Sequence, residues 1–339
     1  MSVASSIVIF LLAISLVIFA SMSLYRGLVA IGAFFRCPER FLGLIAAFAA
    51  DAAEILSAFT AFHVGRHELG FGIILGSNVF NLASMLGVSA LLTGTLKFDH
   101  QKMLLHGTIS FLAALICAFL ILGYIQPWLS LVLLGLFLIP YFALLAPSSK
   151  IVKEMNMPPP EERFLKQALK DVGKKEKPFQ SVKKLLFSIA TAVGSLLGIY
   201  LGCLGVVQEG IHLGDYWNIS TFIIGIVVIA ILTSIPNMLT MIPFAYRKRE
   251  MALISGALNS NTLNILLGIC LPAVFYGIGR IDPQTFLSVY WLLGMTLMTL
   301  VLGYLRKGLF RLDGVVIIVA YLLFLGFLFY SRSFFFVSA

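Results

Sequence analysis

The chain has 339 residues, of which 60% are hydrophobic and only 12% are charged, and its formal net charge is +9. Soluble domains carry about 25% charged residues, so this composition excludes a soluble enzyme and indicates a polytopic membrane protein. In such a protein Lys and Arg report topology first, and the positive charge therefore does not indicate nucleic-acid binding.

Apolar runs long enough to cross a hydrocarbon core of about 30 Å as helices recur along the whole chain. The first is expected to be a retained span, because no basic segment precedes it and no small-residue cleavage site follows it. These runs predict an all-α integral membrane protein with ten transmembrane helices. The predicted spans are 5–24, 41–64, 70–93, 103–123, 128–146, 184–207, 219–246, 251–278, 284–305 and 312–331.

One polar segment, residues 147–183, interrupts the apolar pattern. It is rich in Lys, Arg and Pro, which predicts a solvated cytoplasmic linker. It separates a first half, residues 1–146, from a second half, residues 184–339, and each half holds five predicted spans. Its basic groups could bind anionic lipid, although topology and solvation alone also explain them.

The distribution of basic residues predicts the orientation. If both termini are extracytoplasmic, all of the 24 Lys and Arg except Arg66, Arg280 and Arg332 belong to cytoplasmic linkers, as the positive-inside rule requires. With five spans in each half, the second half enters the membrane from the opposite side, which is the topology of an inverted repeat. The compact chain suits a prokaryotic inner (plasma) membrane, with an organelle membrane as the alternative.

The two halves also match each other in sequence. Residues 42–81 align without a gap on residues 225–264, and Ser77, Asn78 and Asn81 then fall on Ser260, Asn261 and Asn264. Chance similarity between two apolar helices is the alternative. Because the shared residues are polar and lie at membrane depth, we favour a duplication.

Two carboxylates stand in the middle of a predicted span. Asp51 and Glu54 are three residues apart, so they share one helix face. A charged group near the bilayer centre costs at least about 2.5–3.5 kcal/mol, and the pair is therefore expected to bind something positive. The alternative is that one or both are protonated and hydrogen-bonded within the bundle.

Three other predicted spans supply neutral oxygen at the same depth. Carboxylate, amide and hydroxyl oxygens are hard ligands that suit Ca²⁺, Na⁺ or Mg²⁺. Pro236 is expected to break its helix and free backbone carbonyls for coordination. Close helix packing is the alternative role for the serines, and His106 is expected at the membrane interface. The candidate cation ligands are Asp51, Glu54, Ser77, Asn81, Ser234, Asn237, Ser260 and Asn264, of which Asp51, Glu54, Asn81, Asn237 and Asn264 are the metal ligands proper.

The segments GSNVFN at 76–81 and TSIPN at 233–237 resemble the cation/calcium antiporters, the superfamily of sodium/calcium and proton/calcium exchangers. The resemblance implies ten spans in two inverted five-span halves. It places Glu54, Asn81, Asn237 and Asn264 on the central cation-ligand positions of that superfamily. Ser77 and Ser260 fall on flanking ligand positions.

The chain departs from the superfamily pattern in where its acids lie. Asp51 is an additional acid in the first half, whereas Asn237 and Asn264 stand where an acid can occur in the second. Two carboxylates can be balanced by one Ca²⁺, by two Na⁺ or by two protons. We favour protons, because the acid of sodium-coupled members is absent and because neighbouring like charges favour protonation.

These observations predict an antiporter, not an enzyme, that exchanges Ca²⁺ or a similar divalent cation for H⁺ or Na⁺ by alternating access. The first and sixth spans would move against the core. The transported ions and the lipid bilayer are its expected partners, and no cofactor is expected. Two alternatives stay open: an uncoupled cation channel or leak pathway, and a non-transporting cation-binding relative.

Overall fold

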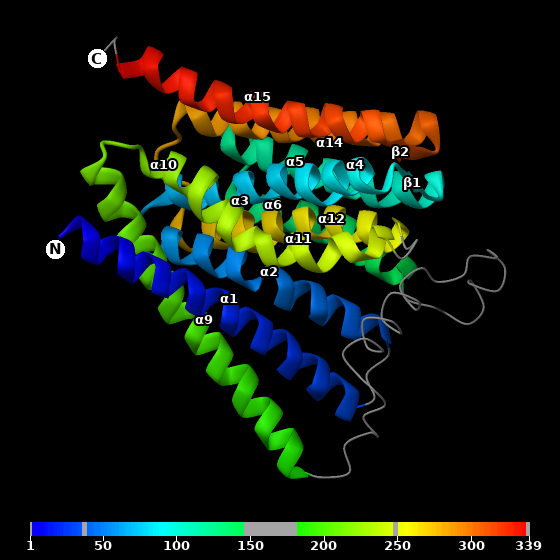
Figure 1. The fold of residues 1–339 in the computed structure, drawn as a ribbon, viewed down its shortest axis with the longest axis horizontal. Coiled ribbons are helices and arrows are strands. Elements are labelled where there is room, and N and C mark those ends of the chain that lie inside the picture. Colours follow the sequence, from blue (N-terminus) through cyan, green and yellow to red (C-terminus); the bar gives the residue numbers. More distant parts are fainter. Residues whose placement is uncertain (1, 36–38, 146–181, 247–249, 337–339) are drawn as a thin grey trace.

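The computed structural model describes residues 2–35, 39–145, 182–246 and 250–336, and nearly all of them are helical (Figure 1). The predicted linker at 147–183 lies almost wholly outside the described residues. The binding of anionic lipid to this linker therefore stays a prediction.

The helices of the first half follow the predicted spans. Helix α3 continues through the π-helix η1 and the short helix α4 as one rod. The elements are α1 (Val3–Phe34), α2 (Glu39–His63), α3 (His67–Asn81), η1 (Leu82–Val88), α4 (Ser89–Thr93), β1 (Thr95–Lys97), α5 (His100–Ile121) and α6 (Pro127–Leu145).

Several helices of the second half begin at a constant offset from helices of the first half. Helix α12 begins at the residue that the alignment of 225–264 on 42–81 pairs with the start of α3, and the same offset relates the start of α14 to that of α5. The N-cap residues of α5 and α14, Asp99 and Asp282, are related by this offset too. The elements are α9 (Val182–Tyr216), α10 (Thr221–Ile223), η2 (Ile224–Ile229), α11 (Ala230–Tyr246), α12 (Glu250–Ile265), η3 (Leu266–Cys270), α13 (Leu271–Tyr276), α14 (Pro283–Arg306), β2 (Gly308–Phe310) and α15 (Arg311–Phe336).

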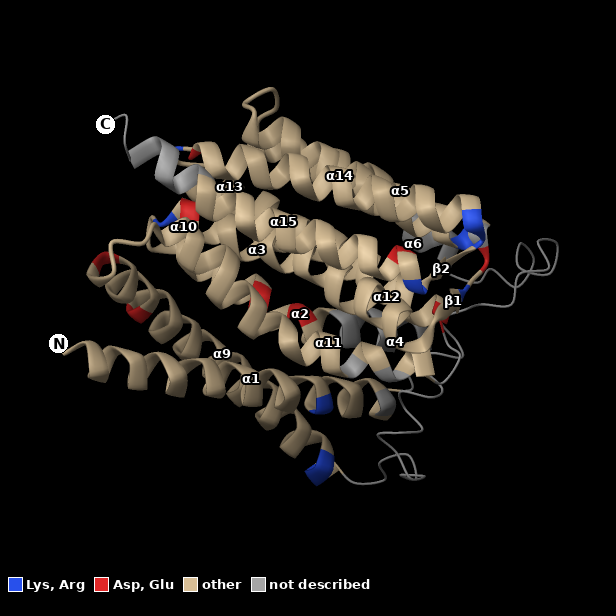
Figure 2. Ribbon diagram, turned by 45° about the horizontal axis from the view of Figure 1, so that its top comes forward, with Lys and Arg blue, Asp and Glu red and all other residues tan. Residues whose placement is uncertain are grey.

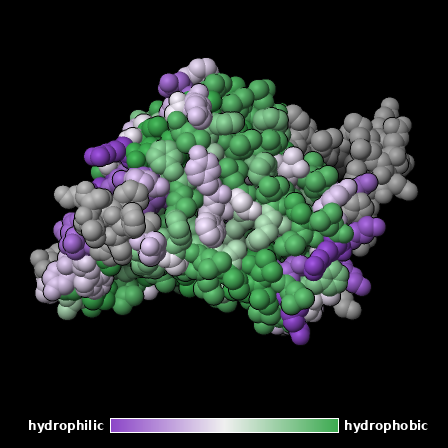
Figure 3. All heavy atoms as spheres, turned by 90° about the horizontal axis from the view of Figure 1, so that it is seen from above, coloured by the Kyte–Doolittle hydropathy of each residue, from purple (hydrophilic) through white to green (hydrophobic). Residues whose placement is uncertain are grey.

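Within the described chain, eight helical segments are long and apolar enough to cross a membrane. Helix α2 is not among them, and α6 counts only as a shorter apolar helix over Pro127–Ile139. The face seen in Figure 3 is mostly apolar between more polar ends, and Figure 2 shows Lys and Arg chiefly toward the ends of the helices. The chain is a mostly helical integral membrane protein.

Helices α1 and α9 form a long crossing pair beside the rest of the bundle (Figure 1). A Cβ atom at Gly202 of α9 would lie 2.6 Å from the Val17 side chain of α1, so the helices touch closely. Helix α9 has 35 residues, or about 50 Å of length, more than an untilted span needs. It therefore includes Glu209, which the sequence places in an outside loop but which is buried in the structure.

Two short strands correct the all-α prediction. Strands β1 and β2 pair antiparallel, with Leu96 opposite Leu309, and both leucines are fully buried. Three residues per strand are too few to produce a recognisable alternation in the sequence. The pairing joins two linkers that were expected on the same side, and both described chain ends lie toward the opposite end of the bundle (Figure 1).

The predicted helix break at Pro236 is wrong. Helix α11 continues from Ala230 to Tyr246 through this proline. Proline removes one backbone donor, here for the carbonyl of Leu232, and such a loss is tolerated in membrane helices that neighbouring helices support. The irregular turns of this rod lie upstream, in η2.

Candidate cation site

The structure brings together all eight predicted ligand residues. They lie on four helices in the interior of the bundle, and Figure 2 shows acidic positions partway along α2. None of the eight exposes more than 6% of its surface. The contributing pairs are Asp51 and Glu54 from α2, Ser77 and Asn81 from α3, Ser234 and Asn237 from α11, and Ser260 and Asn264 from α12.

One set of residues surrounds Glu54, and we call it the Glu54 layer. The hydroxyl of Ser234 donates to Oε1 of Glu54 at 2.7 Å, and Nδ2 of Asn264 donates to Oε2. Ser77 also lies within hydrogen-bonding reach of this carboxylate. Helices α3, α11 and α12 therefore all contact one acid of α2.

A second set, the Asp51 layer, lies about one turn nearer the β1–β2 end. The hydroxyl of Ser260 donates to Oδ1 of Asp51 at 2.7 Å, and Nδ2 of Asn237 donates to the same oxygen at 2.8 Å. Asn81 joins the layer by donating to the Ser260 hydroxyl at 3.3 Å. Each carboxylate thus has its own group of neutral partners.

Asn237 links the two layers. Its Nδ2 atom lies 2.8 Å from Oδ1 of Asp51 and 3.2 Å from Oε1 of Glu54. The two carboxylates therefore converge on one amide nitrogen, as their spacing on a single helix face predicts. Two like charges this close favour a positive charge between them.

Among the residues that the structure describes, three oxygens of the site are buried without a hydrogen-bond partner: Oδ2 of Asp51, Oδ1 of Asn81 and Oδ1 of Asn264. Buried polar atoms are rarely left unpaired, because desolvation without a partner is costly. Among the described residues no group of three or more His, Cys, Asp and Glu side chains could hold a metal. A cation at this site would therefore be held by two carboxylates and by neutral oxygens.

Asn78 and Asn261 are neighbours of the site that the sequence did not mark as ligands. Each donates its side-chain amide to the backbone carbonyl of the other, both at 3.1 Å, and Asn264 also donates to Oδ1 of Asn78. The alignment of the two halves pairs Asn78 with Asn261, and this equivalence was the sequence signal that could have marked them. They tie α3 to α12 directly behind the ligands.

His106, which the sequence places near the membrane interface, is buried inside the bundle. His106 lies in α5, exposes 1% of its surface, and its Nδ1 atom is 3.3 Å from Oδ1 of Asn259. Asn259 immediately precedes Ser260, so a polar contact from α5 reaches the helix that carries two ligands. Sequence spacing alone cannot show a contact between α5 and α12.

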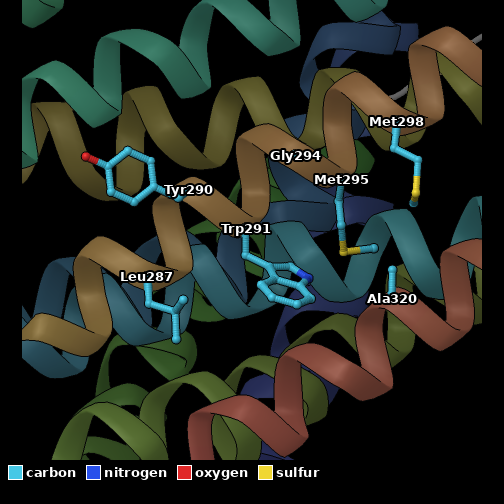
Figure 4. A pocket seen from close by; sticks show the side chains of 7 residues that line it. All are labelled: Leu287, Tyr290, Trp291, Gly294, Met295, Met298 and Ala320. Atoms are coloured by element: carbon cyan, nitrogen blue, oxygen red, sulfur yellow. The ribbon is translucent and has the colours of Figure 1, made fainter. Parts of the chain in front are cut away.

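An apolar pocket of about 340 Å³ also opens between α14 and α15 (Figure 4). Its lining has no carboxylate or amide side chain, so it does not suit a cation. We therefore assign no part of the cation site to it. The lining residues are Leu287, Tyr290, Trp291, Gly294, Met295, Met298 and Ala320.

Known proteins share this fold. The chain superposes with a TM-score of 0.69 on the crystal structure of the H⁺/Ca²⁺ exchanger CAX, at 16% identity, covering 94% of this chain and 81% of that one. For the sodium-calcium exchanger NCX_Mj the TM-score is 0.57 at 19% identity, with 95% and 98% coverage. For YfkE it is 0.65 at 13% identity, with 96% and 91% coverage.

Sequence comparisons identify the family. A curated relative, the sodium/calcium exchanger MaX1 of Methanosarcina acetivorans, is 27% identical over 142 residues, which cover 42% of this chain and 41% of that protein. The match thus spans less than half of the relative. The family model described as "Sodium/calcium exchanger protein" matches residues 5–145 and 187–330, which include every candidate ligand. The chain therefore belongs to the sodium/calcium exchanger protein family.

Proposed function

We propose that this protein is an antiporter that exchanges Ca²⁺, or a similar divalent cation, for H⁺ or Na⁺ at the Asp51 and Glu54 layers. The observation that carries the proposal is the convergence of two buried carboxylates on Asn237, beside buried oxygens that have no partner in the described part of the chain. Carboxylate, amide and hydroxyl oxygens are the ligands of Ca²⁺, which takes six to eight of them.

The charge of the site suggests the stoichiometry. Asp51 and Glu54 together supply two negative charges, and Asn237 and Asn264 add none. One Ca²⁺ or two monovalent cations balance two charges, so the exchange would be electroneutral. We favour protons as the counter-ion, because Asn264 stands where sodium-coupled members can have an acid and because two neighbouring like charges favour protonation.

The asparagines suit a site whose occupant changes. In the structure Asn237 and Asn264 direct their Nδ2 atoms at the carboxylates. Rotation of an amide about its terminal bond exchanges the donor for the acceptor oxygen. The same side chains would therefore stabilise the carboxylates by hydrogen bonds between transport steps and coordinate the cation when it binds.

Alternating access would follow from two inverted five-helix halves, residues 1–146 and 184–339, of which α1 and α9 would move. The reciprocal bonds between Asn78 and Asn261 support a two-fold relation between the halves, as do the matching starts of α3 and α12. Midplane sites at a repeat interface are the pattern of many secondary transporters.

The orientation of the chain is part of the proposal. We place both termini outside a prokaryotic inner membrane and the β1–β2 end in the cytoplasm, because Lys97, Lys102 and Arg306 belong to that end. A reporter that is active only outside the cytoplasm should be active when fused after the last residue. The same reporter should be inactive when inserted between β1 and α5.

Calcium uptake into proteoliposomes tests the function. Three sets of vesicles are needed: one with an outward proton gradient, one with an outward sodium gradient and one with neither. The proposal predicts that Ca²⁺ accumulates above its outside concentration only with a counter-ion gradient, and the effective gradient identifies the counter-ion. Uptake that stops at equal Ca²⁺ concentrations in every set would indicate a channel or leak. Absence of uptake in all sets, from protein that Ca²⁺ still stabilises against heat, would indicate a non-transporting relative.

A further inference from the structure

Three consecutive residues of α12 contact three different helices. Asn259 contacts His106 of α5, Ser260 donates to Asp51 of α2, and Asn261 exchanges hydrogen bonds with Asn78 of α3. Successive residues of a helix point about 100° apart, so the three side chains hold α12 from three directions. Of these contacts, the one to α5 is the only one that the cation site does not already explain.

The geometry of the His106 contact selects one histidine tautomer when the amide oxygen of Asn259 faces the ring. An amide oxygen accepts and cannot donate, so Nδ1 of His106 carries the proton that is directed at Oδ1 of Asn259. His106 is buried inside the bundle, near the start of the candidate span Gln101–Ile121. A polar ring in this environment strongly favours keeping its hydrogen bond.

The residues at the equivalent positions in the two halves cannot form such a contact. At the offset that relates the two halves, His106 corresponds to Val289 of α14 and Asn259 to Gly76 of α3. Neither of these side chains can form a hydrogen bond. Gly76 instead packs against the backbone of η2, where an added Cβ atom would lie 2.5 Å from the carbonyl oxygen of Ile226.

We propose that His106 is a positioning residue for the Asp51 layer: by holding Asn259, it sets the rotation of α12 that presents the Ser260 hydroxyl to Asp51. The His106–Asn259 contact and the additional acid Asp51 both lack an equivalent at the related positions. Asp51 has no acidic counterpart in the second half, where Ser234 corresponds to it. The additional acid and the additional polar contact thus belong to the same layer.

This inference rests on the proposed function, and calcium transport kinetics test it. His106→Val, which copies the residue at 289, should raise the KM for Ca²⁺ about threefold to tenfold with little change in maximal rate, as the loss of one interhelical hydrogen bond in a membrane implies. His106→Asn keeps a donor at the Nδ1 position and should restore the KM. Asn259→Ala should reproduce the effect, and the double variant should be no worse than either single one.

Folding is monitored separately by size-exclusion profile and thermal melting in detergent. A normal KM in a folded His106→Val variant would overturn the inference. Equal KM values for His106→Val and His106→Asn would overturn it too, since ring volume and not the donor would then matter. If the wild-type protein shows no calcium uptake, it is the proposed function that fails. The bond is then tested by whether His106→Val and Asn259→Ala are non-additive in thermal stability; additive effects would overturn it.

Discussion

At the scale of single residues, the site combines fixed charge with adaptable neutral groups. Asp51 and Glu54 supply the charge from one helix, and side chains of three other helices donate to them. An asparagine differs from an acid in that it can present either a donor or an acceptor. The amides of the second half can therefore stabilise carboxylates that acids in the same places would repel.

Asn237→Asp tests this role of the amide. The variant removes the donor shared by Asp51 and Glu54 and adds a third negative charge. Without divalent cation it should lose about 1–3 kcal/mol of stability, the usual cost of leaving a buried group unpaired. Saturating Ca²⁺ should stabilise it by more than the wild type, because the added charge favours the cation. Thermal melting in chelator and in Ca²⁺ measures both effects.

Asn237→Ala is the matched control, because it removes the donor without adding charge. It should be destabilised in chelator but gain no additional stabilisation from Ca²⁺. If Asn237→Asp and the wild type have the same melting temperatures in chelator and in Ca²⁺, Asn237 does not hold the two carboxylates.

The sequence predicted the members of this site but not their partners. The depth of Asp51 and Glu54 and the repeated Ser and Asn spacing were sufficient, because the energetic cost of polar groups in a bilayer restricts where they occur. The roles of His106 and Asn259 depend on which helices touch. Contacts between α5 and α12 come from tertiary packing, which no spacing along the chain encodes.

At the scale of secondary-structure elements, irregular and close-packed turns surround the ligands. The π-helices η1 and η3 begin just after Asn81 and Asn264, and π-helical turns are frequent at functional sites. Helix α3 approaches α10 and η2 so closely that Gly72 and Gly76 face the backbone carbonyl oxygens of Phe222 and Ile226. This contact fixes the depth at which α3 presents Ser77 and Asn81.

Gly76→Ala should therefore destabilise the protein. Its Cβ atom would lie 2.5 Å from the Ile226 carbonyl oxygen and 2.8 Å from Cβ of Ala230, and backbone cannot move aside cheaply. Overpacking of this kind costs about 1–3 kcal/mol. Gly294→Ala is the control, because no atom lies within 4 Å of the added Cβ atom, and it should stabilise α14 by about 0.5–1 kcal/mol. Melting temperatures of Gly76→Ala and Gly294→Ala that shift in the same direction from the wild type would contradict this account.

The start of α14 makes stability depend on pH. Partial burial and the nearby Glu68 raise the pKa of Asp282 above its ordinary value of 3.8, although Arg280 opposes the shift. An acid with a raised pKa in the folded state loses stability as pH rises from its ordinary value through the folded-state value. Asp282→Asn keeps a good N-cap residue and should remove this loss. The melting temperatures of the wild type and Asp282→Asn, measured from about pH 4 to pH 7, should therefore differ at high pH and converge at low pH. A difference that stays constant over this pH range would contradict the prediction.

The errors in predicted elements have physical causes. Pro236 was expected to end a helix, but in a membrane bundle the neighbouring helices support the turn that lacks a hydrogen bond. Hydropathy ended the sixth span at residue 207, whereas α9 continues to Tyr216 along α1 and includes Glu209. The pairing of Leu96 with Leu309 is a contact between distant linkers, and local pattern carries no information about it.

At the scale of the whole molecule, the distribution of charges and the fold both favour a cation site at the two acids of α2. The two acids of α2 lie within a bundle whose other described acidic residues, apart from Glu209, are at or near helix ends or in loops. Helices of both halves surround these acids, and the long pair α1 and α9 packs beside them (Figure 1). The length of the apolar runs predicted most of these helices, because the bilayer constrains every span in the same way.

The central claim is that the two carboxylates of α2 carry one divalent cation in exchange for two monovalent ones. The most direct test is calcium uptake into proteoliposomes at potentials set with valinomycin and K⁺, for the wild type, Glu54→Gln and Asp51→Asn. The account predicts gradient-driven uptake whose rate does not change with potential in the wild type, and loss of uptake in both variants. Uptake at the wild-type rate in folded Glu54→Gln and Asp51→Asn proteins would contradict it.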